Sequence, residues 1–128
     1  MPVTDFHFQD GVFYAREQGD VDAGDAQEWA DHVLRYASEC PHPIAALIDA
    51  RSVKRINAEA RQIFAHATNI PNLSCAVVVT GDFKVVQNAR MINMLSDAKH
   101  THIFTTMDEA VRFLTHKLQR FNGRQAWA

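Results

Sequence analysis

The stretch 44–63 constrains the fold of this chain more than any other. It begins with an unbroken apolar run, Ile44–Ile48, which ends at Asp49. A run that is apolar on both faces is typical of an interior strand in a parallel sheet. A charged segment follows, which we interpret as a loop, and Asn57 then caps the start of a helix. The stretch therefore predicts a strand, a connection and a crossover helix, the unit from which parallel sheets are built.

The segments on either side predict the rest of the sheet. Asp10-Gly11 lies between two runs rich in aromatic and β-branched residues, 6–9 and 12–16, which is the pattern of an antiparallel hairpin. Short apolar runs predict two further strands, at 73–79 and 102–105. Helices are predicted over residues 25–39, 57–68, 83–98 and 106–121. This order predicts an α/β fold, a mixed five-stranded sheet in which an N-terminal hairpin is joined by three βα units, with four helices.

Composition and charge narrow the class of protein. With 128 residues, 47% of them hydrophobic, the chain has the size and composition of a single globular domain, which we place at residues 1–128. The formal net charge is −2 and the basic residues are spread along the chain, so nucleic-acid binding is not expected. No apolar run is long enough to span a membrane, and the amino terminus lacks a signal-peptide pattern. We therefore expect a cytoplasmic protein in which Cys40 and Cys75 are reduced.

The predicted helix at 83–98 is unusual because apolar residues occur on nearly all of its sides. A helix of this kind is buried on more than one side. Either its first turns are irregular, or the C-terminal tail with Trp127 covers it. Alternatively, it offers flexible methionines to a second copy of the chain or to a partner. The residues that we assign to self-association are Phe83, Val86, Met91 and Met94.

A motif spans the central strand and the next helix: Ile48-Asp49-Ala50, followed by Val53-Lys54-Arg55-Ile56-Asn57-Ala58-Glu59-Ala60. It resembles the STAS family (sulfate-transporter and anti-sigma-factor-antagonist domains), and in particular its SpoIIAA-like branch. The family pattern is a strand ending Leu-Asp-Leu, then Val-x-x-Ile-Asp-Ser-Ser-Gly and a helix. The last predicted strand and helix, 103–114, also resemble that branch. The resemblance implies a non-enzymatic regulatory domain that binds proteins, in bacterial signalling.

The chain departs from this family at the regulatory position. In regulated STAS domains a serine at the helix N-terminus is phosphorylated, whereas here the paired serines are replaced by Ala58 and Glu59, and the aspartate by Asn57. Without a hydroxyl group, a phosphoserine switch is not expected at this place. Glu59 is either a mimic of the phosphorylated serine or an ordinary acidic residue that the helix dipole favours.

The sequence contains no constellation that points to catalysis, a cofactor or a metal. Asp49 ends a buried strand, but neither a nucleophile nor a second acid accompanies it, and pairing with Arg51 would make it structural. Cys75 lies within a strand, where a reactive thiolate is not expected. His100 and His102 lack a carboxylate or thiol at a companion spacing for zinc. We therefore expect no enzyme activity, no catalytic residues, no cofactor and no metal site.

Polar residues cluster where the central strand ends and the next helix begins. Sites in parallel sheets tend to lie at such strand ends. The cluster is either an ordinary solvated rim or a docking surface for a protein partner. A further alternative is the mouth of a pocket for a small apolar or lipid ligand, because the related Sec14-like domains hold such ligands. The residues assigned to partner binding are Asp49, Arg51, Ser52, Lys54, Arg55, Asn57, Glu59 and Arg61.

Overall fold

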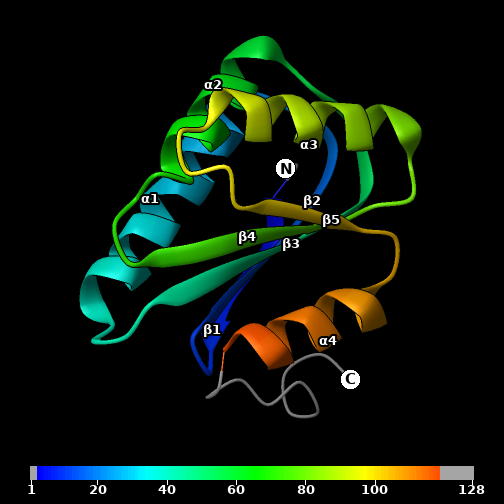
Figure 1. Cartoon of the computed structure of the whole chain (residues 1–128). Helices are drawn as coiled ribbons and strands as arrows, with labels where there is room; N and C mark the ends of the chain where they lie inside the picture. The colour runs from blue at the N-terminus through cyan, green and yellow to red at the C-terminus, as the bar shows by residue number, and fades with distance from the viewer. Residues whose placement is uncertain (1–2, 119–128) are drawn as a thin grey trace.

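The computed structural model describes residues 3–118 of the chain (Figure 1). The strands are β1 (Val3–Gln9), β2 (Val12–Val21), β3 (Ile44–Ile56), β4 (Leu73–Val79) and β5 (Thr101–Phe104). The helices are α1 (Ala23–Glu39), α2 (Ala58–Ala67), α3 (Phe83–Leu95) and α4 (Met107–Lys117). All five strands belong to one sheet, so the predicted α/β class and the order of elements are confirmed.

The strands lie side by side in the order of the sequence, from β1 to β5. β1 and β2 pair antiparallel, and the later neighbours pair parallel. Each parallel connection moves one strand along the sheet in the same direction, and connections of one hand place their helices on one face. Accordingly, α1, α2 and α3 lie on one face of the sheet, whereas α4 follows β5 and covers the other (Figure 1).

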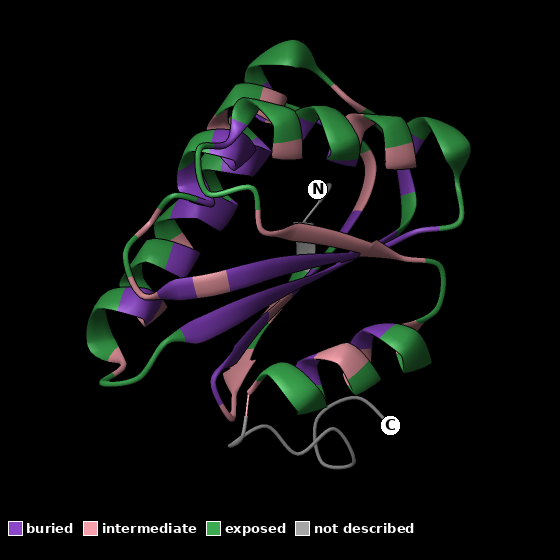
Figure 2. Cartoon of the chain, viewed as in Figure 1, coloured by how far each residue is buried: buried purple, intermediate pink, exposed green. Residues whose placement is uncertain are grey.

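Successive side chains of the strands alternate between two separate cores. Toward α1, α2 and α3, Phe13 of β2 packs near Trp29 of α1, and both are fully buried. Toward α4, Leu47 of β3 and Leu114 of α4 are fully buried in the smaller core. Figure 2 shows β3 and β4 buried over most of their length in the middle of the sheet. Burial on both faces explains why these two strands read as unbroken apolar runs.

Local signals place the hairpin turn and the helix starts as predicted. Asp10 and Gly11 have φ angles of 53° and 82°, the positive values that a tight hairpin turn requires. Asn57 caps α2, because its Oδ1 accepts a hydrogen bond at 2.8 Å from the backbone N–H three residues further on. Thr106 likewise accepts a hydrogen bond from the backbone N–H of Glu109 at the start of α4.

The predicted loop after Asp49 is wrong, because β3 continues to Ile56. The pairing of β3 with β4 ends at Asp49, but its pairing with β2 continues to Ile56. β2 is correspondingly longer than predicted and runs to Val21. Residues 50–56 thus form a two-stranded ribbon with β2 beyond the end of β4. Charged side chains are compatible with such a strand because they point to solvent while β2 supplies the backbone hydrogen bonds.

Some helix ends also differ from their predicted positions. α1 begins slightly earlier than predicted because Asp22 and Asp25 cap each other's backbone N–H groups. α3 ends at Leu95, before the predicted residue 98, because the next residue adopts an extended backbone. The predicted end of the last helix at Phe121 and the tail residue Trp127 lie outside the described residues.

Candidate functional site

The predicted partner-binding residues lie in separate groups along β3 and the start of α2. Asp49 is paired with Arg51, whose Nε and Nη2 donate hydrogen bonds to the two carboxylate oxygens at 2.9 and 2.8 Å. Burial would raise the pKa of Asp49, but the hydrogen bonds and the charge of Arg51 outweigh it and leave that pKa below its ordinary value. The pairing of Asp49 with Arg51, which the sequence analysis considered, makes Asp49 a structural residue.

A second group lines a cleft of about 470 Å³ at the carboxyl ends of β2 and β3. Cationic and carboxylate side chains from four segments meet there. The residues lining this strand-end cleft are Asp20, Val21, Asp22, Lys54, Arg55, Ile56, Asn57, Arg61, Lys84 and Asn88. It brings together four of the eight predicted partner-binding residues, namely Lys54, Arg55, Asn57 and Arg61. The predicted partner-binding residues did not include the start of α1 or the first turns of α3, which join them in this cleft.

Arg61 holds the parts of the strand-end cleft together. Its Nη1 donates hydrogen bonds to the carbonyl oxygen of Ile56 and to Oδ1 of Asn88, both at 2.9 Å. The end of β3, the first turn of α2 and the middle of α3 are therefore linked through one guanidinium group. Two other predicted residues, Ser52 and Glu59, are exposed but do not line this cleft.

The outward face of α3 adjoins the strand-end cleft and carries several exposed apolar side chains. Phe83 is 71% exposed and Met94 is 74% exposed, and Met91 and Leu95 are also exposed. Val86, which we assigned to the same surface, is only partly exposed and lies nearer the core. α3 is thus one-sided, with Val85, Ala89 and Ile92 buried.

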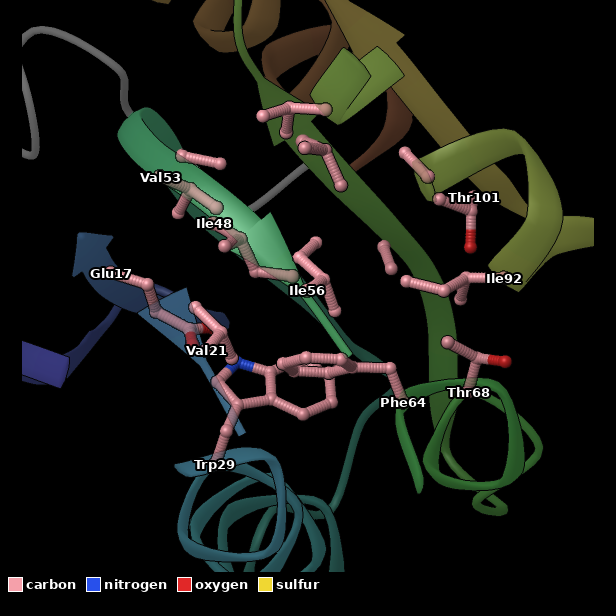
Figure 3. Close-up of a pocket in the computed structure, with 15 residues that line it drawn as sticks. Glu17, Val21, Trp29, Ile48, Val53, Ile56, Phe64, Thr68, Ile92 and Thr101 are labelled. Atoms are coloured by element: carbon pink, nitrogen blue, oxygen red, sulfur yellow. The ribbon is translucent and has the colours of Figure 1, made fainter. Parts of the chain in front are cut away.

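A cavity of about 40 Å³ lies between the sheet and α1, α2 and α3 (Figure 3). Most of its lining is apolar. The lining includes the rings of Trp29 and Phe64, whose centroids are 5.3 Å apart in an edge-on arrangement. Glu17 of β2 also lines it and is only 2% exposed. Burial, together with the charges of Asp25 and Glu28, raises the pKa of Glu17 to about 8.

Our reading of the sequence missed Glu17, although a signal for it exists. Side chains of a strand alternate between faces, so Glu17 falls on the same face as Phe13 and Ala15. The predicted strand ends at Arg16, one residue before Glu17. A carboxyl group at a core position is the type of residue that marks a functional site or a ligand contact.

Other candidate chemistry stays dispersed in the structure. Among residues 3–118, no three histidine, cysteine, aspartate or glutamate side chains gather in a group that could hold a metal ion. Cys75 is fully buried, and burial raises the pKa of its thiol. Within the same residues, no helix has the length and apolar character needed to cross a bilayer.

The fold and these sites define an α/β domain of SpoIIAA-like fold. A solved structure with this fold, an uncharacterised protein of the DUF3478 family from Shewanella loihica PV-4, is similar to this chain with a TM-score of 0.62 and 12% sequence identity. The similarity covers 88% of this chain and 91% of that protein, and it confirms the fold that the sequence resemblance implied. The chain itself belongs to the family described as "Domain of unknown function (DUF7793)", whose model matches residues 6–118. No curated protein is similar to the sequence.

Proposed function

We propose that this domain is a non-enzymatic interaction module that regulates a protein partner by binding it. The partner docks across the strand-end cleft and the adjoining outward face of α3. The observation that carries this proposal is the exposed apolar face of α3, with Phe83 and Met94 uncovered beside a cleft that contains four cationic side chains. An exposed apolar patch next to polar residues is typical of a protein-binding surface.

The cleft and the apolar face are continuous along α3. Lys84 and Asn88 line the cleft. Met91 and Leu95 follow them at a spacing of seven residues, which is about two helical turns. Because residues seven apart lie on the same side of a helix, the apolar side chains extend the cleft wall. A partner segment that lies along α3 therefore contacts both.

The charges of the surface favour an acidic partner over a second copy of the chain. The strand-end cleft contains Lys54, Arg55, Arg61 and Lys84 against two carboxylates, Asp20 and Asp22. Arg90, on the outward side of α3, is exposed as well. A symmetric dimer around α3 would bring two clefts, each with more cations than carboxylates, into one interface, which disfavours association. An acidic segment with apolar side chains complements the surface.

The chemistry of the chain supports binding over turnover. The carboxylate of Asp49 is hydrogen-bonded to Arg51. Cys75 lies inside a buried strand, and burial raises the pKa of its thiol. Ala58 and Glu59 occupy the positions that match the regulatory serines of STAS domains. Regulation by this module therefore depends on a means other than phosphorylation at the start of α2.

The size of the cavity between the sheet and α1, α2 and α3 argues against an acyl chain bound there. A cavity must have a volume of roughly 10–15 Å³ to hold a single water molecule. About 40 Å³ is therefore much too small for an acyl chain. The strand-end cleft is larger, but charged side chains line it, so we favour a protein partner over the lipid-binding alternative.

Site-specific photo-crosslinking in living cells tests the proposal. A photoreactive residue replaces Gln87, which is exposed on the outward side of α3, and in a control strain it replaces Leu34 of α1, which is 48% exposed. We expect a specific cross-linked protein from position 87 that is absent from position 34. The purified partner should then bind Arg55→Glu and Met94→Asp about tenfold or more weakly, and Leu34→Asp with unchanged affinity.

The same measurements can contradict the proposal. If Arg55→Glu and Met94→Asp both bind the cross-linked partner as tightly as the unaltered protein, docking across the cleft and α3 is wrong. Equal weakening by Leu34→Asp would show that loss of folding or charge balance, and not loss of this surface, explains the effect. Circular dichroism of each variant separates unfolding from lost contacts.

A further inference from the structure

The strand-end cleft carries more positive than negative charge. Four cationic side chains line it, namely Lys54, Arg55, Arg61 and Lys84, together with two carboxylates, which leaves an excess of two positive charges. A phosphate monoester has a charge of about −1.5 to −2 at pH 7 and so matches this excess with a single group. We infer that the strand-end cleft binds the phosphate group of a ligand, with Arg61 as the fixed anchor.

Arg61 is held in place by one nitrogen of its guanidinium group, and its other nitrogens stay available. Nη1 donates hydrogen bonds to the carbonyl oxygen of Ile56 and to Oδ1 of Asn88. Nε and Nη2 make no hydrogen bond within residues 3–118, and neither of them is buried. A guanidinium group that is oriented before binding loses little side-chain freedom when it binds an anion. Arg61 can therefore donate two parallel hydrogen bonds, from Nε and Nη2, to two oxygens of a phosphate group.

The other three cations of the cleft are exposed and have no acidic partner in the described part of the chain. Lys54 and Arg55 lie at the end of β3, and Lys84 lies in the first turn of α3. Their side chains make neither an ion pair nor a hydrogen bond within residues 3–118. Of the two carboxylates, Asp22 is engaged in capping the start of α1, and Asp20 lies opposite Arg55 in the pairing of β2 with β3. Uncompensated positive charge therefore remains for a ligand.

A phosphate group suits these donors better than a carboxylate does. The cations come from three elements, β3, α2 and α3, so they reach the cleft from different sides. A phosphate monoester offers three acceptor oxygens and nearly two charges on one centre, whereas a carboxylate offers two oxygens and one charge. Two ligands can supply the phosphate group: inorganic phosphate, or a phosphorylated side chain of the docking partner. The second of these rests on the proposed function and names the acidic group of the partner.

Nuclear magnetic resonance titration of the full chain, at constant pH and ionic strength, tests the inference. The probes are inorganic phosphate and N-acetyl-O-phosphoserine amide, and the control is N-acetylglutamate amide, which carries one carboxylate. We expect saturable shifts of the backbone amides of Arg55, Arg61 and Lys84 with at least one phosphate probe, and binding of the control about fivefold or more weakly. Tighter binding of the phosphoserine derivative than of inorganic phosphate would assign the group to a phosphorylated side chain, and the reverse order to a free ion.

Variants distinguish recognition in the cleft from a general attraction of anions. Arg61→Lys keeps the charge but loses the two parallel donors, so it should weaken phosphate binding roughly 10-fold. Because Arg61 also links β3 to α3, Arg55→Gln and Lys84→Gln serve as variants at exposed positions, and each should weaken binding roughly 3- to 10-fold. Arg90→Gln removes the same charge from an exposed position of α3 that does not line the cleft, and it should leave the affinity unchanged.

Three results would overturn the inference. They are the absence of a saturable shift with both phosphate probes, equally tight binding of N-acetylglutamate amide, and equal weakening by Arg90→Gln and Arg55→Gln. The titration contains no partner protein, so failure of the docking surface along α3 would leave its result unchanged. Conversely, a failed titration would leave the cross-linking test of the proposed function valid.

Discussion

At the scale of single residues, Glu17 stands out because it occupies a core position with an ionisable side chain. It lies on the face of β2 that carries Phe13 and Ala15, and it is 2% exposed. Opposite it, β3 has two residues, 50 and 51, where β2 has one, so the regular ladder is interrupted at this point. Keeping a carboxyl group here costs stability whenever the group must ionise.

The raised pKa of Glu17 predicts a specific dependence of stability on pH. The folded state holds the proton up to about pH 8, whereas the unfolded chain releases it near 4.5. Between these values the folded state binds more protons, so its stability falls as pH rises, by about 1.4 kcal/mol for each pH unit at most. Below pH 4.5 and above pH 8, Glu17 adds no further slope.

Urea denaturation at several pH values, with Glu17→Gln as the matched variant, checks this prediction. The substituted amide side chain does not ionise, so the difference in unfolding free energy between Glu17→Gln and the unaltered protein should grow in favour of the variant between about pH 5 and pH 8. Parallel pH profiles of the two proteins across this range would show that Glu17 ionises normally in the folded state. Other carboxyl groups contribute to both profiles and cancel in the difference.

At the scale of elements, α3 carries four of the five large hydrophobic side chains that are exposed among the described residues. One side carries Val85, Ala89 and Ile92 into the core, and the other leaves Phe83, Met91, Met94 and Leu95 exposed. The excess of cations in the adjoining cleft disfavours a symmetric dimer, and a partner protein is therefore the occupant that we propose for this face.

The molar mass in solution, measured by light scattering, tests whether α3 contacts a second copy of the chain. We predict the same molar mass for the unaltered protein and for Met94→Asp across a wide range of concentrations. Removing one exposed methionine should not change the oligomeric state if α3 does not contact a second copy. A mass that falls toward that of a single chain on substitution would instead assign the outward face of α3 to self-association. Leu34→Asp, on α1, is the control for a general effect of an added charge.

Local patterns in the sequence predicted most elements but not the extension of β3. The positive φ of Asp10 and Gly11 and the caps at Asn57 and Thr106 depend only on neighbouring residues, so they could be predicted. The strand character of residues 50–56 depends on pairing with the second half of β2. A charged segment carries no local sign of such a distant partner, and it was therefore interpreted as a loop.

At the scale of the whole molecule, the order of the strands creates the proposed site. Because β2, β3 and β4 are parallel neighbours, their carboxyl ends and the starts of α1, α2 and α3 lie at one edge of the sheet. The sequence could predict that residues 54–61 lie at such an edge. It could not predict that residues 20–22 and 84–88 complete the cleft, because this depends on which strands are neighbours and on how α3 lies against α2.

The most direct measurement of the proposed docking surface is hydrogen–deuterium exchange of the protein, alone and in complex with the purified partner that cross-linking identifies. We predict slower exchange on binding in two segments, 54–61 and 83–95, with unchanged exchange in α4 and in the outer side of α1. Protection confined to α4 or to α1, with 54–61 and 83–95 unaffected, would contradict the proposal that the partner docks at the strand-end cleft and along α3.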